Sequence, residues 1–287
     1  MMNCASGPNL QSSIFNLPSH WRLLRHGHAT GAENMAVDEA IAQGIAEGVS
    51  PPTLRFYGWT PPCVSLGRNQ QVHGIDLAAC AERGYDIVRR PTGGRAILHT
   101  DELTYSIAAS PDHPLMAGLV LDAYLRISRG LVAGLRRLGI AAEEAPGSNR
   151  AGPDVSAACF EVPSAYEITA GGRKILGSAQ ARRAKSVLQH GSLPLVGDVA
   201  RVVDCLAFAD PAEREALRRS LTEHATTVEQ VTGRQVGYEE AMEALIAGVA
   251  ETLELDLVPG ELTEQERAWM AELLRDKYCN DTWTLRV

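Results

Sequence analysis

The sequence contains no long hydrophobic run, few basic residues and no secretion signal. No stretch of its 287 residues approaches the roughly 20 apolar residues that a membrane-spanning helix requires, so we expect no membrane insertion. Its 27 lysines and arginines are outnumbered by 35 acidic residues, and the net charge of -8 argues against nucleic-acid binding through a general basic field. The first 20 residues lack a basic start followed by an apolar core, which predicts a cytoplasmic protein.

Metal-binding and nucleotide-binding signatures are missing as well. The six cysteines, at positions 4, 63, 80, 159, 205 and 279, form no CxxC pair and no Cys/His cluster at zinc spacing. Neither the GxxxxGKS/T motif of a P-loop nor the GxGxxG spacing of a dinucleotide site is present. We therefore predict no metal site, and we interpret the cysteines as thiols of which one or two at most do chemistry.

The composition that remains, with 45% hydrophobic and 22% charged residues, is that of an ordinary globular protein. Residues 1–20 are polar and aperiodic, which indicates a flexible leader. Short strand-like runs and amphipathic helices follow at close spacing. The predicted strands are 53–57, 63–66, 85–90, 96–98 and 103–108, and the predicted helices are 34–48, a short one after Asp76, and 115–138.

The second half of the chain begins with a loop at 145–158 that is rich in glycine, proline, asparagine and alanine. Residues 166–179 predict a hairpin around Gly171-Gly172, and 187–195 predict a further strand. From about 197 the pattern becomes helical, either as a small subdomain or as the outer layer of one domain. We predict an α+β fold of mixed β-sheets flanked by helices, in a single domain over 21–287 with a helical C-terminal portion.

The segment 89–99 joins an apolar strand to a glycine turn. Gly93 and Gly94 allow backbone angles that other residues avoid, and they let a ligand approach the main chain. Basic groups crowd the turn and would suit an anionic head group or a phosphate. They are Arg89, Arg90, Arg95 and His99. A plain hairpin with exposed arginines has the same pattern, so the segment alone leaves both interpretations open.

Cys159 lies in a loop between small and aromatic residues, a setting that is typical of an inert buried thiol. It becomes a nucleophile if a cation stabilises its thiolate, and Lys174 is the candidate for that cation. The Lys174 ammonium points either to solvent or into a pocket. The small residues of Gly177-Ser178-Ala179-Gln180 would form the floor of a narrow slot for an acyl chain.

The histidines allow a structural and a functional interpretation. His190, next to Gly191, is either a satisfied structural residue or part of the same pocket. His26 and His28 are expected in a loop before the first helix, with structural or surface roles. Asn34, Asp38 and Glu39 are expected to cap and solvate that helix rather than to catalyse, although the start of the helix could also face the ligand groove.

Four motifs, in order along the chain, resemble those of the lipoate-protein ligase A and octanoyltransferase family. They are Arg89-Arg-Pro-Thr-Gly-Gly-Arg-Ala-Ile-Leu-His99, Glu102-Leu-Thr-Tyr-Ser106, Lys174-Ile-Leu-Gly-Ser-Ala-Gln180 and Leu188-Gln-His-Gly-Ser-Leu193. The resemblance extends from about Trp21 to Leu195 and returns at Lys277-Tyr278 through Trp283. It implies the biotin/lipoate protein ligase-like fold.

Within that family the chain is most similar to the Cys-dependent octanoyltransferases of Gram-positive bacteria. Cys159 precedes Pro163-Ser-Ala-Tyr-Glu167, and the lysine motif ends in Gly-Ser-Ala-Gln. Family ligases that use ATP tend to have a third glycine where Arg95 stands, and an Asn-Asp pair near the position of Cys159. These departures count against ATP use, and the resemblance implies an enzyme without a cofactor.

The reaction implied by the resemblance moves an octanoyl group from acyl carrier protein to a lysine of a lipoyl domain or of the glycine cleavage H protein. Cys159 would carry the octanoyl group as a thioester, and Lys174 would lower the pKa of the thiol or position the carbonyl. The enzyme is expected to be a monomer that binds neither nucleic acid nor membrane. The implied substrate-binding residues are Arg89, Gly93, Gly94, Arg95, His99, Gly177, Ser178, Ala179, Gln180, His190 and Gly191.

Two other functions stay open on the same residues. A lipoate ligase that uses ATP and magnesium, or an amidotransferase that moves lipoyl or octanoyl groups between proteins, would keep the fold and change the chemistry. A non-catalytic binding protein would keep the fold with Cys159 as an inert core residue.

Overall fold

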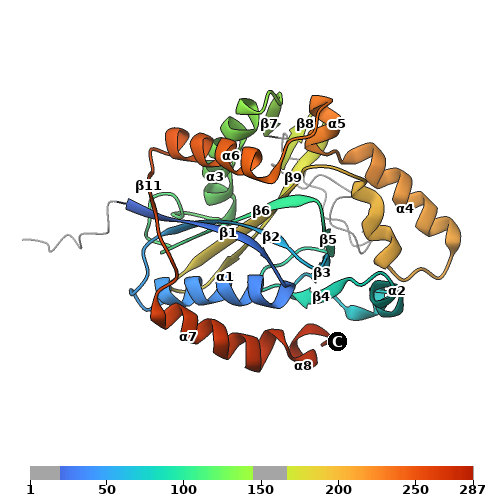
Figure 1. Cartoon of the computed structure of the whole chain (residues 1–287), viewed down its shortest axis with the longest axis horizontal. Helices are drawn as coiled ribbons and strands as arrows, with labels where there is room; N and C mark the ends of the chain where they lie inside the picture. The colour runs from blue at the N-terminus through green and yellow to red at the C-terminus, as the bar shows by residue number, and fades with distance from the viewer. Residues whose placement is uncertain (1–19, 145–166, 287) are drawn as a thin grey trace, which may run out of the picture.

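The computed structural model describes residues 20–144 and 167–286, which form two β-sheets with helices on both sides (Figure 1). The larger sheet has the strand order β11-β1-β2-β6-β10-β9-β8-β7. Its strands β11, β1 and β2 are parallel, and every later pair is antiparallel. The strands are β1 (His20–Ala29), β2 (Thr53–Trp59), β6 (Glu102–Ala109), β7 (Ala142–Glu144), β8 (Ile168–Ala170), β9 (Arg173–Arg182), β10 (Val187–Pro194) and β11 (Asp256–Pro259).

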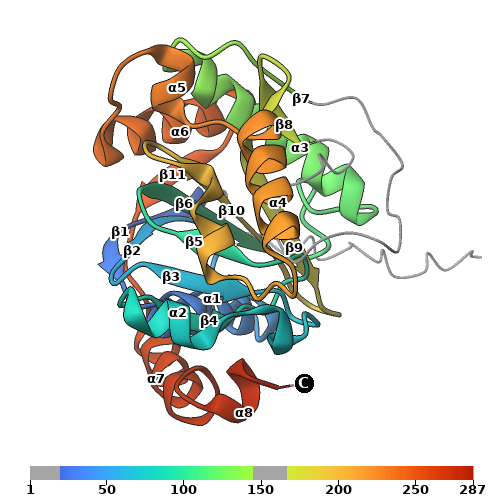
Figure 2. The same ribbon diagram turned by 90° about the vertical axis from the view of Figure 1, so that its right-hand side faces the viewer.

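The smaller sheet has three strands in the order β4-β3-β5, and it forms a second layer beside the large sheet. Its strands are β3 (Cys63–Leu66), β4 (Asp86–Arg89) and β5 (Ile97–His99). Short helices pack around it and share its separate apolar core (Figure 2). They are η1 (Val72–Gly74), α2 (Leu77–Glu82), η2 (Val199–Cys205) and α4 (Pro211–His224).

Longer helices cover both faces of the large sheet. On one face α3 (Val120–Arg137) and α6 (Tyr238–Thr252) enclose the main core, with α5 (Val228–Thr232) at its border. On the other face lies α1 (Gly31–Ala46), and the C-terminal helices run below it (Figure 1). These are α7 (Glu264–Leu273), the π-helical turn η3 (Leu274–Tyr278) and α8 (Asp281–Thr284). None of the helices in the described part of the chain is long and apolar enough to cross a membrane.

Helix α1 is buried on nearly all sides because it lies between the large sheet and α7. Its first turn is fixed by a capping box, in which the Thr30 hydroxyl accepts from the Glu33 N–H and the Glu33 carboxylate accepts from the Thr30 N–H. A bidentate ion pair ties α7 to the sheet, with Arg22 Nη2 at 2.6 Å and Nη1 at 2.7 Å from the Glu266 carboxylate. Polar side chains on α1 therefore face protein on both sides.

Several predicted elements are confirmed. Strand β3 has the predicted bounds, Asp76 caps α2 by accepting from the Ala79 N–H, and α1 lies within a few residues of its predicted range. The hairpin also forms, because Gly171 and Gly172 take the left-handed angles (φ 57° and 75°) that its turn requires. Helices of the C-terminal portion pack in the same apolar clusters as the sheets.

Strands β1, β7 and β11 were not predicted, and one helix start differs from the prediction. His26 and His28 lie in strand β1 and not in a loop. The outer half of β1 is polar and largely exposed, so it lacks the alternation that marks a strand, and β11 is a short exposed edge strand. Helix α3 begins at Val120 and not at 115, because Gly118 adopts φ 86° and ends the preceding turn.

Glycines bring α3 and α6 unusually close together. A Cβ on Gly248 would lie 2.1 Å from the backbone nitrogen of Gly134, and a Cβ on Gly134 would lie 2.7 Å from Cα of Leu245. The obstacle in both cases is helix backbone, which cannot move aside as a flexible side chain can. The short distance between α3 and α6 therefore depends on the absence of side chains at Gly134 and Gly248.

We predict that Gly248→Ala destabilises the protein by about 1–3 kcal/mol, because the added methyl group forces the two helices apart. Gly27→Ala is the matched control, since a Cβ there meets nothing within 4 Å. Equilibrium unfolding in urea measures both. Equal unfolding midpoints for the two variants would show that the crossing tolerates the methyl group.

Candidate functional site

A cavity lies between the two sheets, near the N-terminal end of α1. Its floor consists of residues from β9 and β10, and its opposite wall comes from the small sheet and the segment after β4. The lining residues predicted from the sequence are Gly177, Ser178, Ala179, His190, Gly191 and His99. Arg90, named above among the cations of the glycine turn, also lines the cavity. The lining residues that were not predicted are Met35, Tyr57, Trp59, Ser65, Ile97, Thr104 and Ser192. All four sequence motifs thus supply lining residues to one cavity, the Glu102–Ser106 motif through Thr104.

His99 is held in one orientation on the wall of this cavity. Its Nδ1 lies 2.6 Å from the Glu102 carboxylate, which only accepts, so Nδ1 donates. Its Nε2 lies 2.7 Å from Oγ of Ser65 and accepts the hydroxyl proton. The ring also stacks on Trp59, with centroids 3.9 Å apart and an interplanar angle of 8°.

Glu102 is the centre of that wall. Its Oε1 also accepts from Thr104 at 2.7 Å and from Ser192 at 2.9 Å, so hydroxyl groups of β6 and β10 share one carboxylate oxygen. Neither Glu102 nor Ser65 was singled out from the sequence. Glu102 follows His99 by three positions, which is the one signal that could have joined them.

His190 belongs to a second buried network, centred on Asp38 of α1. The Asp38 carboxylate accepts from Arg55 at 2.7 Å, Ser106 at 2.8 Å, Tyr57 at 2.9 Å and His190 Nδ1 at 3.2 Å. It thereby joins α1 to β2, β6 and β10. The prediction that Asp38 caps or solvates its helix is wrong, since the residue has no exposed surface.

The other polar residues of α1 are buried too, so their predicted solvent-facing roles are also wrong. Asn34 accepts from Arg55 at 2.7 Å and donates to the Gly58 carbonyl at 2.8 Å, while Thr30 caps the helix. Glu39 pairs with Arg183 and Lys277. A polar pair four residues apart among alanines was the sequence signal for the buried network, because Asn34 and Asp38 lie on one helix face.

These networks set the protonation of their members. Burial alone would raise the pKa of Asp38, but the Arg55 guanidinium and hydrogen bonds from His190 and Ser106 lower it from 3.8 to about 2. Burial lowers the pKa of His190, which keeps the ring neutral. Its Nε2 then accepts from the Thr92 hydroxyl at 2.7 Å, so His190 connects the cavity to the glycine turn.

The two leading arginines of the turn bind protein backbone. Arg90 donates to the carbonyls of Ser65 and Arg95, both at 2.8 Å, and of Gly93 at 2.9 Å, which closes the turn around its guanidinium. Arg89, fully buried, donates instead to carbonyls of the C-terminal segment and of the loop after β3. These carbonyls belong to Trp283, Thr284, Arg286, Gly67, Arg68 and Gln70.

Some predicted binding residues do not line the cavity. Gly93, Gly94 and Arg95 form the turn next to it, where Gly94 adopts φ 92° and its carbonyl approaches Gly67 closely. Gln180 donates to Gln189 at 2.9 Å, and Gln189 in turn donates to Tyr105 in the main core, on the other face of the sheet. Arg89 is also absent from the lining, because its donors face the C-terminal segment.

Of the predicted catalytic pair, only Lys174 can be placed, because Cys159 lies outside the described residues. Lys174 is buried at the start of β9, and its Nζ lies 2.5 Å from the Glu167 carboxylate. The solvent-facing interpretation of Lys174 is therefore wrong. Lys174 does not line the cavity, but the strand that carries it continues into the cavity floor at Gly177.

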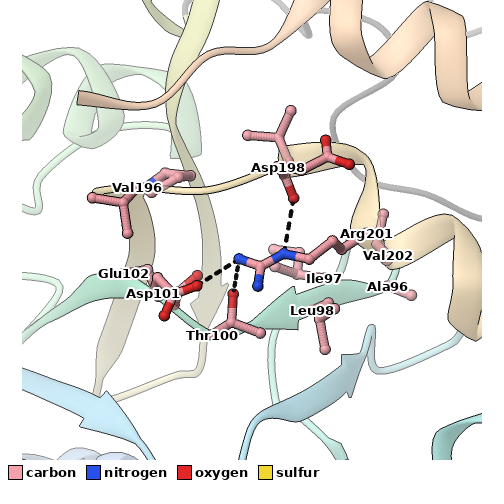
Figure 3. A pocket seen from close by; sticks show the side chains of 12 residues that line it. Ala96, Ile97, Leu98, Thr100, Asp101, Glu102, Val196, Asp198, Arg201 and Val202 are labelled. Carbon is pink, nitrogen blue, oxygen red and sulfur yellow. Dashed lines mark hydrogen bonds and ion pairs between the residues drawn. The ribbon is translucent and has the colours of Figure 1, made fainter. Parts of the chain in front are cut away.

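A second cavity lies between the β5–β6 turn and η2, and no predicted site residue lines it (Figure 3). Arg201 crosses it and donates to Thr100 Oγ1 at 2.9 Å and to Asp101 at 2.7 Å. Its Nε donates to the Asp198 carbonyl at 3.2 Å. The guanidinium therefore joins the turn to η2, which is a structural role.

Residues 30–250 match the family described as the lipoyl protein ligase A/B catalytic domain. The chain belongs to this family. Lipoyl protein ligase A/B relatives include proteins named octanoyltransferase LipM. One, from Carboxydothermus hydrogenoformans, is 43% identical over 93% of this chain and 98% of its own length, and one from Symbiobacterium thermophilum is 46% identical over 94% and 100%.

Solved structures of lipoate ligases share the fold of this lipoyl protein ligase A/B chain. The bipartite lipoate protein ligase of Thermoplasma acidophilum superposes with a TM-score of 0.78 at 26% identity, covering 93% of this chain and 96% of that one. A lipoate-protein ligase A bound with ATP gives 0.75 at 28% identity, with 93% and 98% covered. The predicted family and the predicted lipoate-ligase fold are thus confirmed.

The Asp38 network predicts a specific acid sensitivity. A carboxyl whose pKa falls from 3.8 unfolded to about 2 folded stabilises the fold above pH 3.8, and this stabilisation is lost as pH falls through 2. It amounts to roughly 2 kcal/mol. We expect the free energy of unfolding of Asp38→Asn to change less between pH 5 and pH 2 than that of the unchanged protein.

Urea unfolding at each pH measures this difference, with the exposed Asp112→Asn as the control variant. An identical pH dependence of the unchanged protein and Asp38→Asn would mean that the Asp38 carboxylate is not stabilised in the fold.

Proposed function

We propose that this chain is an octanoyltransferase of protein lipoylation. It takes octanoyl from an acyl carrier protein and places it on a lysine of a lipoyl domain or of the glycine cleavage H protein. The observation that carries the proposal is the 43–46% identity to octanoyltransferases over nearly the full length of both chains. The cavity supports it, because the family motifs converge there on walls of suitable chemistry.

The cavity offers an acyl chain a narrow, mostly apolar slot. Met35, Trp59 and Ile97 supply apolar wall, while Gly177 and Ala179 leave room above the sheet. Burial of about 0.8 kcal/mol per methylene gives an octanoyl chain roughly 5 kcal/mol of binding free energy. The polar groups of the walls are engaged with one another, as in His99 with Glu102, so they present few unsatisfied donors to the chain.

In the proposed chemistry, the Cys159 thiolate attacks the carbonyl of the donor thioester. A C–S bond to Cys159 forms, the bond to the donor sulfur breaks, and the donor leaves as a thiolate that takes up a proton. The two thioesters have nearly equal energy, so no nucleotide is required. The neutral acceptor amine then forms an amide and displaces Cys159 as thiolate, and the amine loses one proton.

Lys174 is the proposed partner of Cys159 in both steps. Its ammonium lowers the pKa of the thiol or positions the acyl carbonyl. The Glu167 carboxylate, 2.5 Å from Nζ, gives this buried side chain a partner of opposite charge. At roughly 3.3 Å per strand residue, Lys174 lies about 10 Å along β9 from Gly177, so one strand carries both the cation and the cavity floor.

We predict that Cys159→Ala abolishes octanoyl loading, whereas Cys279→Ala, at an exposed thiol, leaves it intact. Intact-mass spectrometry after mixing with octanoyl-acyl carrier protein measures the adduct. An octanoyl adduct on Cys159→Ala would overturn the role of Cys159. ATP-dependent attachment of lipoate by Cys159→Ala would instead identify a ligase.

A bulky side chain on the cavity floor should shorten the acyl chain that the enzyme accepts. We expect Ala179→Leu to lose octanoyl loading by about tenfold or more and to retain loading with butanoyl donors, because the leucine fills the slot. Ala212→Leu, at an exposed position of α4, is the control. Loading rates are measured with acyl donors of four to eight carbons. Equal losses of loading rate at every chain length would contradict the assignment of this cavity as the acyl site.

The monomeric state and cytoplasmic location expected from the sequence stay predictions.

A further inference from the structure

Basic side chains gather beside the glycine turn, although the protein as a whole is acidic. Arg68, exposed, directly follows the loop glycine that approaches Gly94, and its backbone N–H donates to the Thr92 carbonyl at 2.8 Å. Arg286 donates to the Arg68 carbonyl. The Arg286 carbonyl in turn accepts from Arg89 at 3.0 Å, so both ends of this contact are anchored in the fold.

Two further cations lie on the α1 side of the turn. Arg183 and Lys277 share the carboxylate of Glu39, with Lys277 Nζ at 2.6 Å. Glu39 and Arg183 line a small depression together with Pro91 of the turn. Burial lowers the pKa of Lys277, the paired Glu39 carboxylate opposes this shift, and the charges of Arg183 and Arg68 lower the pKa further.

Trp283 fixes the C-terminal members of the group. Lys277 Nζ lies 4.0 Å from the centre of the indole ring, and Arg286 Cζ lies 4.2 Å from it. Both cations therefore make cation–π contacts with the same ring. The indole Nε1 donates to the Arg89 carbonyl at 2.9 Å. We call Arg68, Arg183, Lys277 and Arg286 the basic rim.

Repulsion among the cations of the basic rim destabilises the free protein, and an anionic partner would relieve it. Among the described contacts, Glu39 neutralises two of these cations, Arg183 and Lys277, and neighbouring like charges repel. Packing and backbone hydrogen bonds hold them in place nonetheless. The turn that they flank connects through Thr92 and His190 to the acyl cavity. Cations beside a binding site attract and orient an anionic partner.

We propose that the basic rim docks the acyl donor, an acidic carrier protein whose acyl chain hangs on a phosphodiester-linked arm. The proposal rests on the proposed function, because it assumes that the acyl group enters this cavity. The donor brings anions to the rim, both on its surface and in the arm. The acceptor brings a lysine ammonium to the same cavity, and the rim beside it would repel that cation.

The experiment uses the full chain with Arg68→Glu, which reverses one exposed charge and keeps the backbone hydrogen bonds of Arg68. Arg219→Glu, an exposed arginine on α4, is the matched control, and Arg68→Lys tests rescue by charge alone. The readout is the rate of octanoyl-enzyme formation against donor concentration, at low salt and at 0.5 M salt. Two donors are compared: octanoyl-acyl carrier protein and octanoyl-pantetheine, which has neither a protein nor a phosphate.

We expect Arg68→Glu to raise the KM for octanoyl-acyl carrier protein about tenfold at low salt, with a smaller effect at high salt because added ions screen the charges. The loss with octanoyl-pantetheine should be several-fold smaller. Arg68→Lys should restore most of the affinity, and Arg219→Glu should behave as the unchanged protein.

Three results would overturn the proposal. Equal losses with both donors would mean that Arg68→Glu distorts the cavity. A raised KM for the acceptor protein, with the donor unaffected, would assign the rim to the acceptor. No loading of the unchanged protein by either donor would overturn the proposed function itself. That result is distinct from the first two because it is obtained with the unchanged protein and not with a variant.

Discussion

The buried carboxylate of Asp38 is the interaction on which the site depends. It joins α1 to β2, β6 and β10 through Arg55, Tyr57, Ser106 and His190. A buried charge is tolerated only when it is paired and its remaining acceptor positions are filled, and four donors meet both conditions here. Because His190 also holds Thr92, the same carboxylate fixes the distance between the helix, the cavity floor and the glycine turn.

Arginine serves in this fold as a connector of backbone. A guanidinium has five N–H donors in one plane, which suits it to bind several carbonyl groups at once. Arg90 closes the glycine turn in this way, and Arg89 connects the turn to the C-terminal helices. A cluster of arginines in a motif is therefore no measure of the charge that a ligand meets. The cations that face a partner, such as Arg68, lie beside the motif.

Local sequence patterns predicted most of the elements, and the family motifs predicted the fold and much of the cavity. Gly177, Ala179, His99 and His190 meet as the motif order implied. What local patterns could not give was which face of a helix is buried. The acidic residues of α1 looked solvent-facing because the groups that cover them come from other parts of the chain. The sheet covers Asp38, and η3, whose Tyr278 lies 239 residues further along, covers Glu39. Strand β1 was missed for a related reason, since its polar outer half becomes ordered only by long-range pairing.

The contact between Arg89 and the C-terminal segment has a consequence for how the protein is made. Trp283 and Arg89 are separated by 194 residues, so the turn gains this support only after nearly all of the described chain has left the ribosome. Until then Arg89 lacks the carbonyl partners that Trp283, Thr284 and Arg286 supply. The glycine turn therefore acquires its full set of hydrogen bonds only after both sheets, whose last strand is β11, have been synthesised.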